Sequence, residues 1–343
     1  MPLNRERLQK KFEGNRKSKL SRGSQIIEDS TIRTLDNFCH DVHKQSLNRC
    51  MDEIRIEMQG NPDSDTPYDF LIDFYGSEKK RGISIRTLNM RLCFIKQHFI
   101  ENGIELIDSK FKKIHEKQPK YNRKGVSAEQ IQQVMSFCSD RVKAIMMVQA
   151  SSGMRISEVI NLRRKDFIKM DRWMINIRAE ITKSKQQRIT FISKEAEQYV
   201  LPYLNRLPED SEERVFQITR EGLTTAIERA TIKSGQTERY EHSGYLVFTS
   251  HALRAFFITQ VGKTDNNFAH ALAGHDFYMT AEYNRLNDQE KCEKYIDLEE
   301  SILIFRDKDS SKDDRITQLE KELAELKKCF KGKKLRLEDY EEE

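Results

Sequence analysis

Apolar residues recur at helical spacing through the first third of the chain. They follow the helical period in three stretches, Ile27 to Val42, Leu47 to Met58 and Leu88 to Phe99. The polar segment GNPDSDTP (60–67) interrupts this pattern, and Phe70 to Tyr75 indicates a short helix after it. Such spacing is typical of helices that bury one face. We therefore predict an all-helical domain of four or five helices over residues 26–115.

The second half of the chain mixes helical and strand periods. Ser127, with Gln130 three residues later, matches a capping box at the start of a helix. Residues 173–177 and 189–191 alternate apolar and polar side chains, which predicts two strands of a small antiparallel sheet joined by a basic hairpin tip at 181–188. The remaining periodicity predicts helices at about 142–150, 156–162, 194–206, 220–233, 250–262, 266–274 and 279–284. We expect a mixed α+β domain over residues 127–305.

Two further segments complete the predicted organisation. Residues 116–126 contain Pro119, several charges and few apolar side chains, which is typical of an extended linker. Within residues 306–343, apolar residues from Ile316 to Phe330 follow about two coiled-coil heptads, before an acidic tail. This segment is predicted to form a helix that packs on its own domain or a short coiled coil with a partner. The expected fold class is mainly α, with one small antiparallel sheet.

Charge and cysteine content narrow the classes of function. The 343 residues include 60 Lys and Arg against 55 Asp and Glu, a formal net charge of +5. Residues 1–25 hold eight basic and two acidic residues, so we expect a basic arm attracted to phosphates, or else a solvated tail. No apolar run reaches the ~18 residues of a transmembrane helix, and no secretory signal is recognisable. The six cysteines form no CxxC pair, which favours reduced thiols in an intracellular protein.

The sequence lacks several common catalytic motifs. It has no GxxxxGK[ST] loop, no GxGxxG, no HExxH and no GxSxG. No dense cluster of histidine and acidic residues has the spacing of metal ligands. We therefore expect no nucleotide cofactor, no metal and no membrane partner, and the candidate chemistry rests on basic residues, histidines and tyrosines.

Two stretches carry that chemistry. Arg155, in SSGMRISEV, is predicted to lie just before a helix start, where backbone N–H groups and its planar guanidinium can bind a phosphate. The alternative is an Arg155–Glu158 pair on a helix surface. Further along, His251 and Arg254 are three residues apart and share one helix face. The segment AGHDFYMTAEYNR, which begins with Ala273, then supplies a histidine and two tyrosines.

Taken in order, the motifs SSGMRISEV, SHALRAFF and AGHDFYMTAEYNR resemble those of the tyrosine recombinase, or phage-integrase, family. The resemblance covers roughly residues 26–285. It implies a site-specific DNA recombinase or integrase that cleaves and rejoins double-stranded DNA through a 3′-phosphotyrosyl intermediate, without metal or ATP. It also implies a core-binding domain at 26–115 that clamps DNA together with the catalytic domain, and a homotetramer on synapsed DNA.

The resemblance also implies roles for individual residues. Those that would bind the phosphate are Arg155, His251, Arg254 and His275. Glu158 would support the site, and Lys183 on the hairpin would be the general acid, with Lys185 as the alternative. Tyr283 would be the nucleophile, although it is one residue nearer to the histidine than is usual in the family, and Tyr278 is the alternative.

Two other functions fit the same residues. A type IB topoisomerase-like enzyme would share the nucleophile and the cationic site but would relax one duplex without exchange. A catalytically silent DNA-binding protein would keep the charges and form no covalent bond to DNA.

Overall fold

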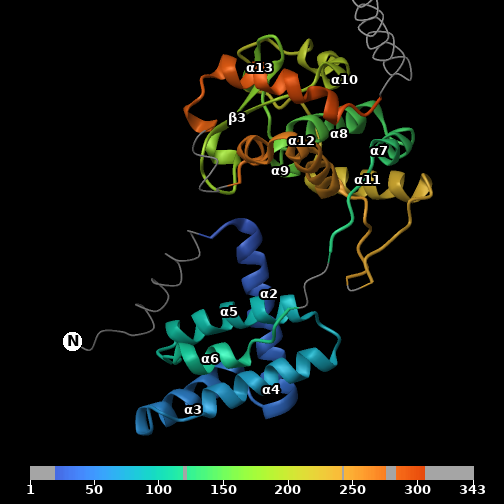
Figure 1. Ribbon diagram of the computed structural model, residues 1–343. Helices are drawn as coiled ribbons and strands as arrows, with labels where there is room; N and C mark the ends of the chain where they lie inside the picture. Colours follow the sequence, from blue (N-terminus) through green and yellow to red (C-terminus); the bar gives the residue numbers. More distant parts are fainter. Residues whose placement is uncertain (1–19, 119–121, 242, 276–282, 306–343) are drawn as a thin grey trace, which may run out of the picture. The chain divides into compact units, whose positions relative to one another are not determined.

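The computed structural model describes residues 20–118, 122–241, 243–275 and 283–305 (Figure 1). They form two compact units, and the chain passes from one to the other between Asn122 and Arg123. The arm predicted for residues 1–25 lies outside the described residues except for its end, where Arg22 already begins a helix. The C-terminal helix and tail predicted for residues 306–343 also lie outside.

All regular secondary structure in the described part of the first unit is helical, as predicted. Its elements in order are α2 (Arg22–Phe38), the π-helical turn η1 (Cys39–His43), α3 (Leu47–Gly60), α4 (Thr66–Lys80), α5 (Ile85–Glu101) and α6 (Asp108–Ile114). The predicted interruption at 60–67 separates α3 from α4, which has a proline in its first turn. Leu71, Phe74 and Leu92 are completely buried in the core of this unit.

The second unit surrounds a buried helix. Its first helices are α7 (Ala128–Met135), α8 (Asp140–Ser152) and the short α9 (Ile156–Val159). Ser127 and Gln130 form the predicted capping box at the start of α7. Helix α8 buries nearly all of its residues and contacts both α10 (Lys194–Leu204) and α12 (Ser250–Ala273). A helix that is apolar on all sides is stable only in such surroundings.

One antiparallel sheet of three strands lies in this unit, in the order β1 (Phe167–Lys169), β2 (Trp173–Ile177) and β3 (Arg188–Phe191). The two predicted strands are confirmed as β2 and β3, with Ile175 opposite Thr190.

The remaining elements of this unit are η2 (Arg164–Asp166), η3 (Ala179–Ile181), α11 (Arg220–Lys233), the 3-10 turn η5 (Tyr283–Arg285), α13 (Asp288–Glu299) and η6 (Glu300–Ile302).

Helix α12 contains a kink that matters for the site. We predicted separate helices over 250–262 and 266–274, and the chain leaves helical geometry at Asp265 (φ −142°, ψ 92°). The Asp265 carboxylate accepts the backbone N–H of Phe268 at 2.9 Å, so it caps the second half of the helix. The helix predicted over 279–284 falls largely outside the described residues.

Two global features complete the description. Among the described helices, none combines the length and the apolar character that a membrane crossing requires. The described cysteines are all free thiols.

Candidate functional site

The site begins where α8 ends. Gly153 has a φ of +66°, and a Cβ at this position would lie 2.4 Å from the ring of Phe257. Only glycine accepts both the left-handed conformation and this close approach. The chain therefore turns sharply after α8, and Arg155 becomes the residue that precedes α9.

Arg155 is paired with Glu158 twice. One carboxylate oxygen of Glu158 accepts the backbone N–H of Arg155 at 2.8 Å, and the other accepts its Nη1 at 3.0 Å. The pair that we considered on a helix surface is thus present, but the Glu158 side chain is only 1% exposed. The carboxylate is an internal support for a guanidinium that remains partly exposed.

A second arginine reaches the same carboxylate from the sheet. Arg188 donates from Nη2 and Nη1 to the two oxygens of Glu158, at 2.7 and 3.2 Å. Burial alone would raise the pKa of Glu158, but the hydrogen bonds and charges of Arg188 and Arg155 lower it below its ordinary value. The single carboxylate neutralises only one of the two positive charges, so the site keeps a net positive charge.

Arg254, on α12, adds a third guanidinium. Its Nη1 donates to the carbonyl of Gly153 at 2.6 Å, and the residue is only 3% exposed. Its Nη2 is buried and has no hydrogen-bond partner within the described part of the chain. Burial and the nearby charge of Arg155 lower the pKa of Arg254 to about 10, so it is still a cation at neutral pH. A buried cationic donor without an acceptor is unfavourable and indicates a place for an anion.

Two histidines border this cluster. Partial burial, followed by the charges of Arg123, Arg254 and Arg155, lowers the pKa of His251. Burial, followed by the charge of Arg254 and then by His270 and the other arginines of the site, lowers the pKa of His275 to about 4. Both rings are therefore neutral at pH 7, and each can donate a hydrogen bond without adding a charge.

His270 is a member of the site that sequence reasoning missed. Its Nδ1 lies 2.7 Å from the Nδ1 of His275, so one ring donates this hydrogen bond and the other accepts it. If His270 donates, the Nε2 of His275 carries the other proton and can donate in turn. The signal in the sequence is a second histidine five residues before His275, in AHALAGH.

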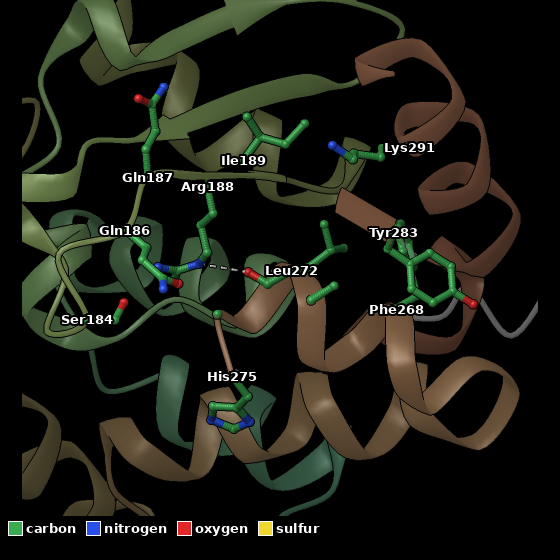
Figure 2. Close-up of a pocket in the computed structure, with 12 residues that line it drawn as sticks. Ser184, Gln186, Gln187, Arg188, Ile189, Phe268, Leu272, His275, Tyr283 and Lys291 are labelled. Carbon is green, nitrogen blue, oxygen red and sulfur yellow. Dashed lines mark hydrogen bonds between the residues drawn. The ribbon is translucent and has the colours of Figure 1, made fainter. Parts of the chain in front are cut away.

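Tyr283 lies on the wall of a cavity of about 380 Å³ beside this cluster (Figure 2). The lining residues include Ser184, Gln186, Arg188, His275, Tyr283 and Lys291. In Figure 2 the hydroxyl of Tyr283 points away from His275 and Arg188. It donates instead to Asp265 Oδ2 at 2.8 Å, and Lys294 Nζ lies 2.7 Å from the same oxygen.

The environment of Tyr283 does not activate its hydroxyl in this conformation. Burial and the Asp265 carboxylate raise the pKa of Tyr283, and the Lys294 ammonium offsets only part of this effect. The structure therefore brings the predicted arginines and histidines together but leaves the tyrosine hydroxyl turned away from them.

The remaining candidates are the hairpin lysines and the second tyrosine. Lys183 and Lys185 are both exposed on the connection between η3 and β3, and Lys185 has a φ of +58°. Neither ammonium has a hydrogen-bonding or ionic partner within the described ranges, so both alternatives stay open. Tyr278 lies outside the described residues.

The sequence is also similar to those of known proteins. The phage integrase family model matches residues 124–290. Two curated relatives are tyrosine recombinases named XerA. The one from Pyrococcus horikoshii is 25% identical to this chain over 191 residues, and the one from Thermococcus kodakarensis is 25% identical over 194 residues. Each match spans 55% of this chain and 65% of the relative.

Likeness to solved structures supports the fold. A lambda integrase dimer bound to a COC′ core site matches with a TM-score of 0.56 and 14% identity, over 83% of this chain and 97% of that one. At this identity the likeness establishes the architecture, which is mainly helical with a small antiparallel sheet.

Proposed function

Residues 124–290 match the phage integrase family model, and from this premise we propose that the protein is a site-specific DNA recombinase or integrase of the tyrosine type. One observation carries the proposal: Arg254, which feels the charges of two further arginines, has a buried guanidinium nitrogen with no hydrogen-bond partner among the described residues. A phosphodiester of double-stranded DNA supplies the anion that this cluster lacks, because a planar guanidinium can bind two phosphate oxygens at once.

The proposed reaction is an exchange of phosphodiester bonds. The Tyr283 oxygen attacks the phosphorus, the bond from phosphorus to the 5′-oxygen breaks, and a 3′-phosphotyrosyl link forms. Lys183, or Lys185 in its place, protonates the departing 5′-oxygen. Attack by the 5′-hydroxyl of a second strand reverses these steps and releases the tyrosine. One phosphodiester replaces another, so the balance requires neither ATP nor a metal ion.

The arginines and histidines stabilise the charge that develops on the phosphorus centre. Arg155 and Arg254 are held by Glu158 and by the carbonyl of Gly153, so they need little reorganisation during the reaction. His251 and His275 would donate hydrogen bonds as neutral rings. For His275 to donate from Nε2, His270 would donate the hydrogen bond between the two Nδ1 atoms and so hold His275 in that tautomer.

Tyr283 must move before it can react. Its hydroxyl is bonded to Asp265, whose carboxylate favours the protonated phenol. A phenol with an ordinary pKa of ~10 is a weak nucleophile at neutral pH until cations stabilise its phenolate. We infer that this conformation is a resting state, and that contact with the arginines would activate the tyrosine.

The proposal extends to the rest of the chain. We infer that residues 26–115 form the DNA clamp, that residues 116–126 link it to the catalytic domain at 127–305, and that the basic arm contacts DNA phosphates. A tetramer on synapsed DNA is the expected assembly, because strand exchange joins two duplexes. The protein would act inside the cell, in the cytoplasm, where it meets its DNA.

A covalent-adduct assay tests the function. Labelled DNA fragments from around the protein's own gene are mixed with the full chain, denatured with detergent and examined for protein-linked label. We expect an adduct that Tyr283→Phe and Arg155→Ala abolish. Tyr278→Phe and Tyr245→Phe should retain it, the latter because Tyr245 is 74% exposed and outside the site.

The other outcomes separate the rival functions. An adduct combined with plasmid relaxation, but never with the joining of two sites, would indicate a topoisomerase-like enzyme. Tight DNA binding without an adduct on any fragment, genomic fragments included, would indicate a silent binder and would refute the proposal.

A further inference from the structure

Arg188 occupies an unusual position between three parts of the site. It is the first residue of β3, directly after the hairpin that carries the candidate lysines, and its side chain is 12% exposed. The guanidinium lies against the turn after α12: a Cβ at Gly274 would come within 2.7 Å of its Nε. Gly274, with a φ of +73°, is therefore the residue that lets this guanidinium reach its place.

Each nitrogen of this guanidinium has an acceptor. Nη1 and Nη2 share the carboxylate of Glu158, and Nε donates to the backbone carbonyl of Leu272 at 3.0 Å. That carbonyl is one of the last in α12, where helical partners run out. A planar guanidinium can bond a carboxylate and a carbonyl together, whereas a lysine ammonium is a single compact donor.

These contacts connect two residues that are predicted to touch the phosphate. Through Glu158, Arg188 is linked to Arg155, whose backbone and side chain bond the same carboxylate. Through Leu272, it is linked to the turn that presents His275. The Gly274 N–H bonds the carbonyl of Ala271, so this turn closes directly on the anchored end of α12.

We propose that Arg188 is a positioning residue that fixes the His275 turn relative to Glu158 and Arg155, and does not itself bind the phosphate. Its effect on catalysis rests on the function proposed above, but its effect on the turn does not. Arg188 should therefore have two separable effects. It keeps residues 270–275 ordered, and it raises the rate of DNA cleavage.

Arg178 provides a matched control. It is also 12% exposed, bonds a buried carboxylate, that of Asp166, at 2.9 and 3.2 Å, and donates to a backbone carbonyl, that of Asn161, at 3.0 Å. It does not line the cavity beside Tyr283. Arg178→Lys thus removes the same kind of anchor from the same unit without touching the His275 turn.

The test compares Arg188→Lys and Arg188→Met with Arg178→Lys in the full-length protein. Hydrogen exchange of the peptide covering residues 270–275 should accelerate about tenfold in both Arg188 variants, because the anchoring hydrogen bond is lost. The single-turnover rate of adduct formation should fall about 10- to 100-fold, as expected when reacting groups are slightly misplaced. DNA affinity should stay within about twofold, since phosphate contacts elsewhere dominate binding. Arg178→Lys should leave exchange and rate near wild type.

Several results would overturn the inference. Unchanged exchange at 270–275 in Arg188→Lys would show that the arginine does not hold the turn. An equal loss of rate in Arg178→Lys would show a general effect on the fold, and so would a failure of both Arg188 variants to fold. An absence of any adduct with the wild-type protein would refute the proposed function instead, and the exchange experiment would still decide whether Arg188 orders the turn.

Discussion

Replacement of Asp265 by Asn should accelerate the reaction of Tyr283. The hydroxyl of Tyr283 donates to a carboxylate oxygen that is shared with Lys294. A hydrogen bond to a charged acceptor is worth about 1.5–3 kcal/mol, and 1.4 kcal/mol corresponds to a factor of about ten. Asn keeps an oxygen to accept the N–H of Phe268, so the second half of α12 stays capped. The substitution weakens the hydrogen bond that holds the tyrosine hydroxyl, and it also removes the ion pair between Asp265 and Lys294.

The change should be visible as a rate. With protein in excess over a labelled DNA fragment, we expect the Asp265→Asn variant to form the covalent adduct about tenfold faster, at the lower end of that range because the site is partly open to water. Asp140→Asn, which alters an acid at the start of α8 whose side chain is 91% exposed and does not line the cavity beside Tyr283, should react at the wild-type rate. An unchanged or slower rate in a variant with a normal thermal transition would refute the reasoning, because the Asp265 contact would then not restrain Tyr283.

Two further predictions concern the frame of the site. Gly153→Ala should destabilise the domain by about 2–4 kcal/mol in denaturant unfolding, because it combines a φ of +66° with overlap of the Phe257 ring; Gly60→Ala, where a Cβ meets nothing within 4 Å, is the control and should change stability little. An NMR titration of the His275 ring should show protonation only near pH 4. The unfolded chain binds this proton at about pH 6.5, so the histidine makes the folded state lose stability as the pH falls from about 6.5 toward 4. Protonation of the folded ring near pH 6.5 would contradict the burial that we describe.

Local patterns in the sequence were enough to predict most helices. The Ser127–Gln130 box forms as expected because both of its hydrogen bonds are made within one turn. The strand at 173–177 follows from simple alternation. By contrast, α13 was not predicted, because its buried residues Cys292, Tyr295 and Leu298 stand among charged neighbours in a strongly polar segment. Strand β1 is three residues long and buries only Phe167, too little for a pattern.

The candidate site was accessible to sequence reasoning one residue at a time. Order along the chain was enough to propose Arg155, Arg254 and His275, and the structure places them in one cationic environment. The order of residues along the chain could not show that Arg188, 30 residues after Glu158, bonds the same Glu158 carboxylate as Arg155. Contacts of this kind depend on how a strand packs against a helix start, which no local spacing encodes.

The direction of the Tyr283 hydroxyl could not be predicted from the sequence either. The motif predicts a tyrosine near the phosphate, but the direction of its hydroxyl depends on Asp265 and Lys294, which lie on different helices. The tyrosine's role and those of the other site residues stay predictions until the adduct assay is done.

Among the described residues, the Glu158 carboxylate contacts two of the three guanidiniums of this site, and this excess of positive charge has a consequence for the lifetime of the protein. Like charges held together inside a domain repel one another, so this cluster lowers the stability of the folded chain while no anion is bound. An anion that binds only the folded state recovers that loss, and the recovery grows with its concentration. DNA would then act as a folding ligand, and the unoccupied protein would be the form most open to proteolysis. Selection for a more stable free protein would favour the loss of Arg254, although the proposed chemistry needs this residue to bind the phosphate.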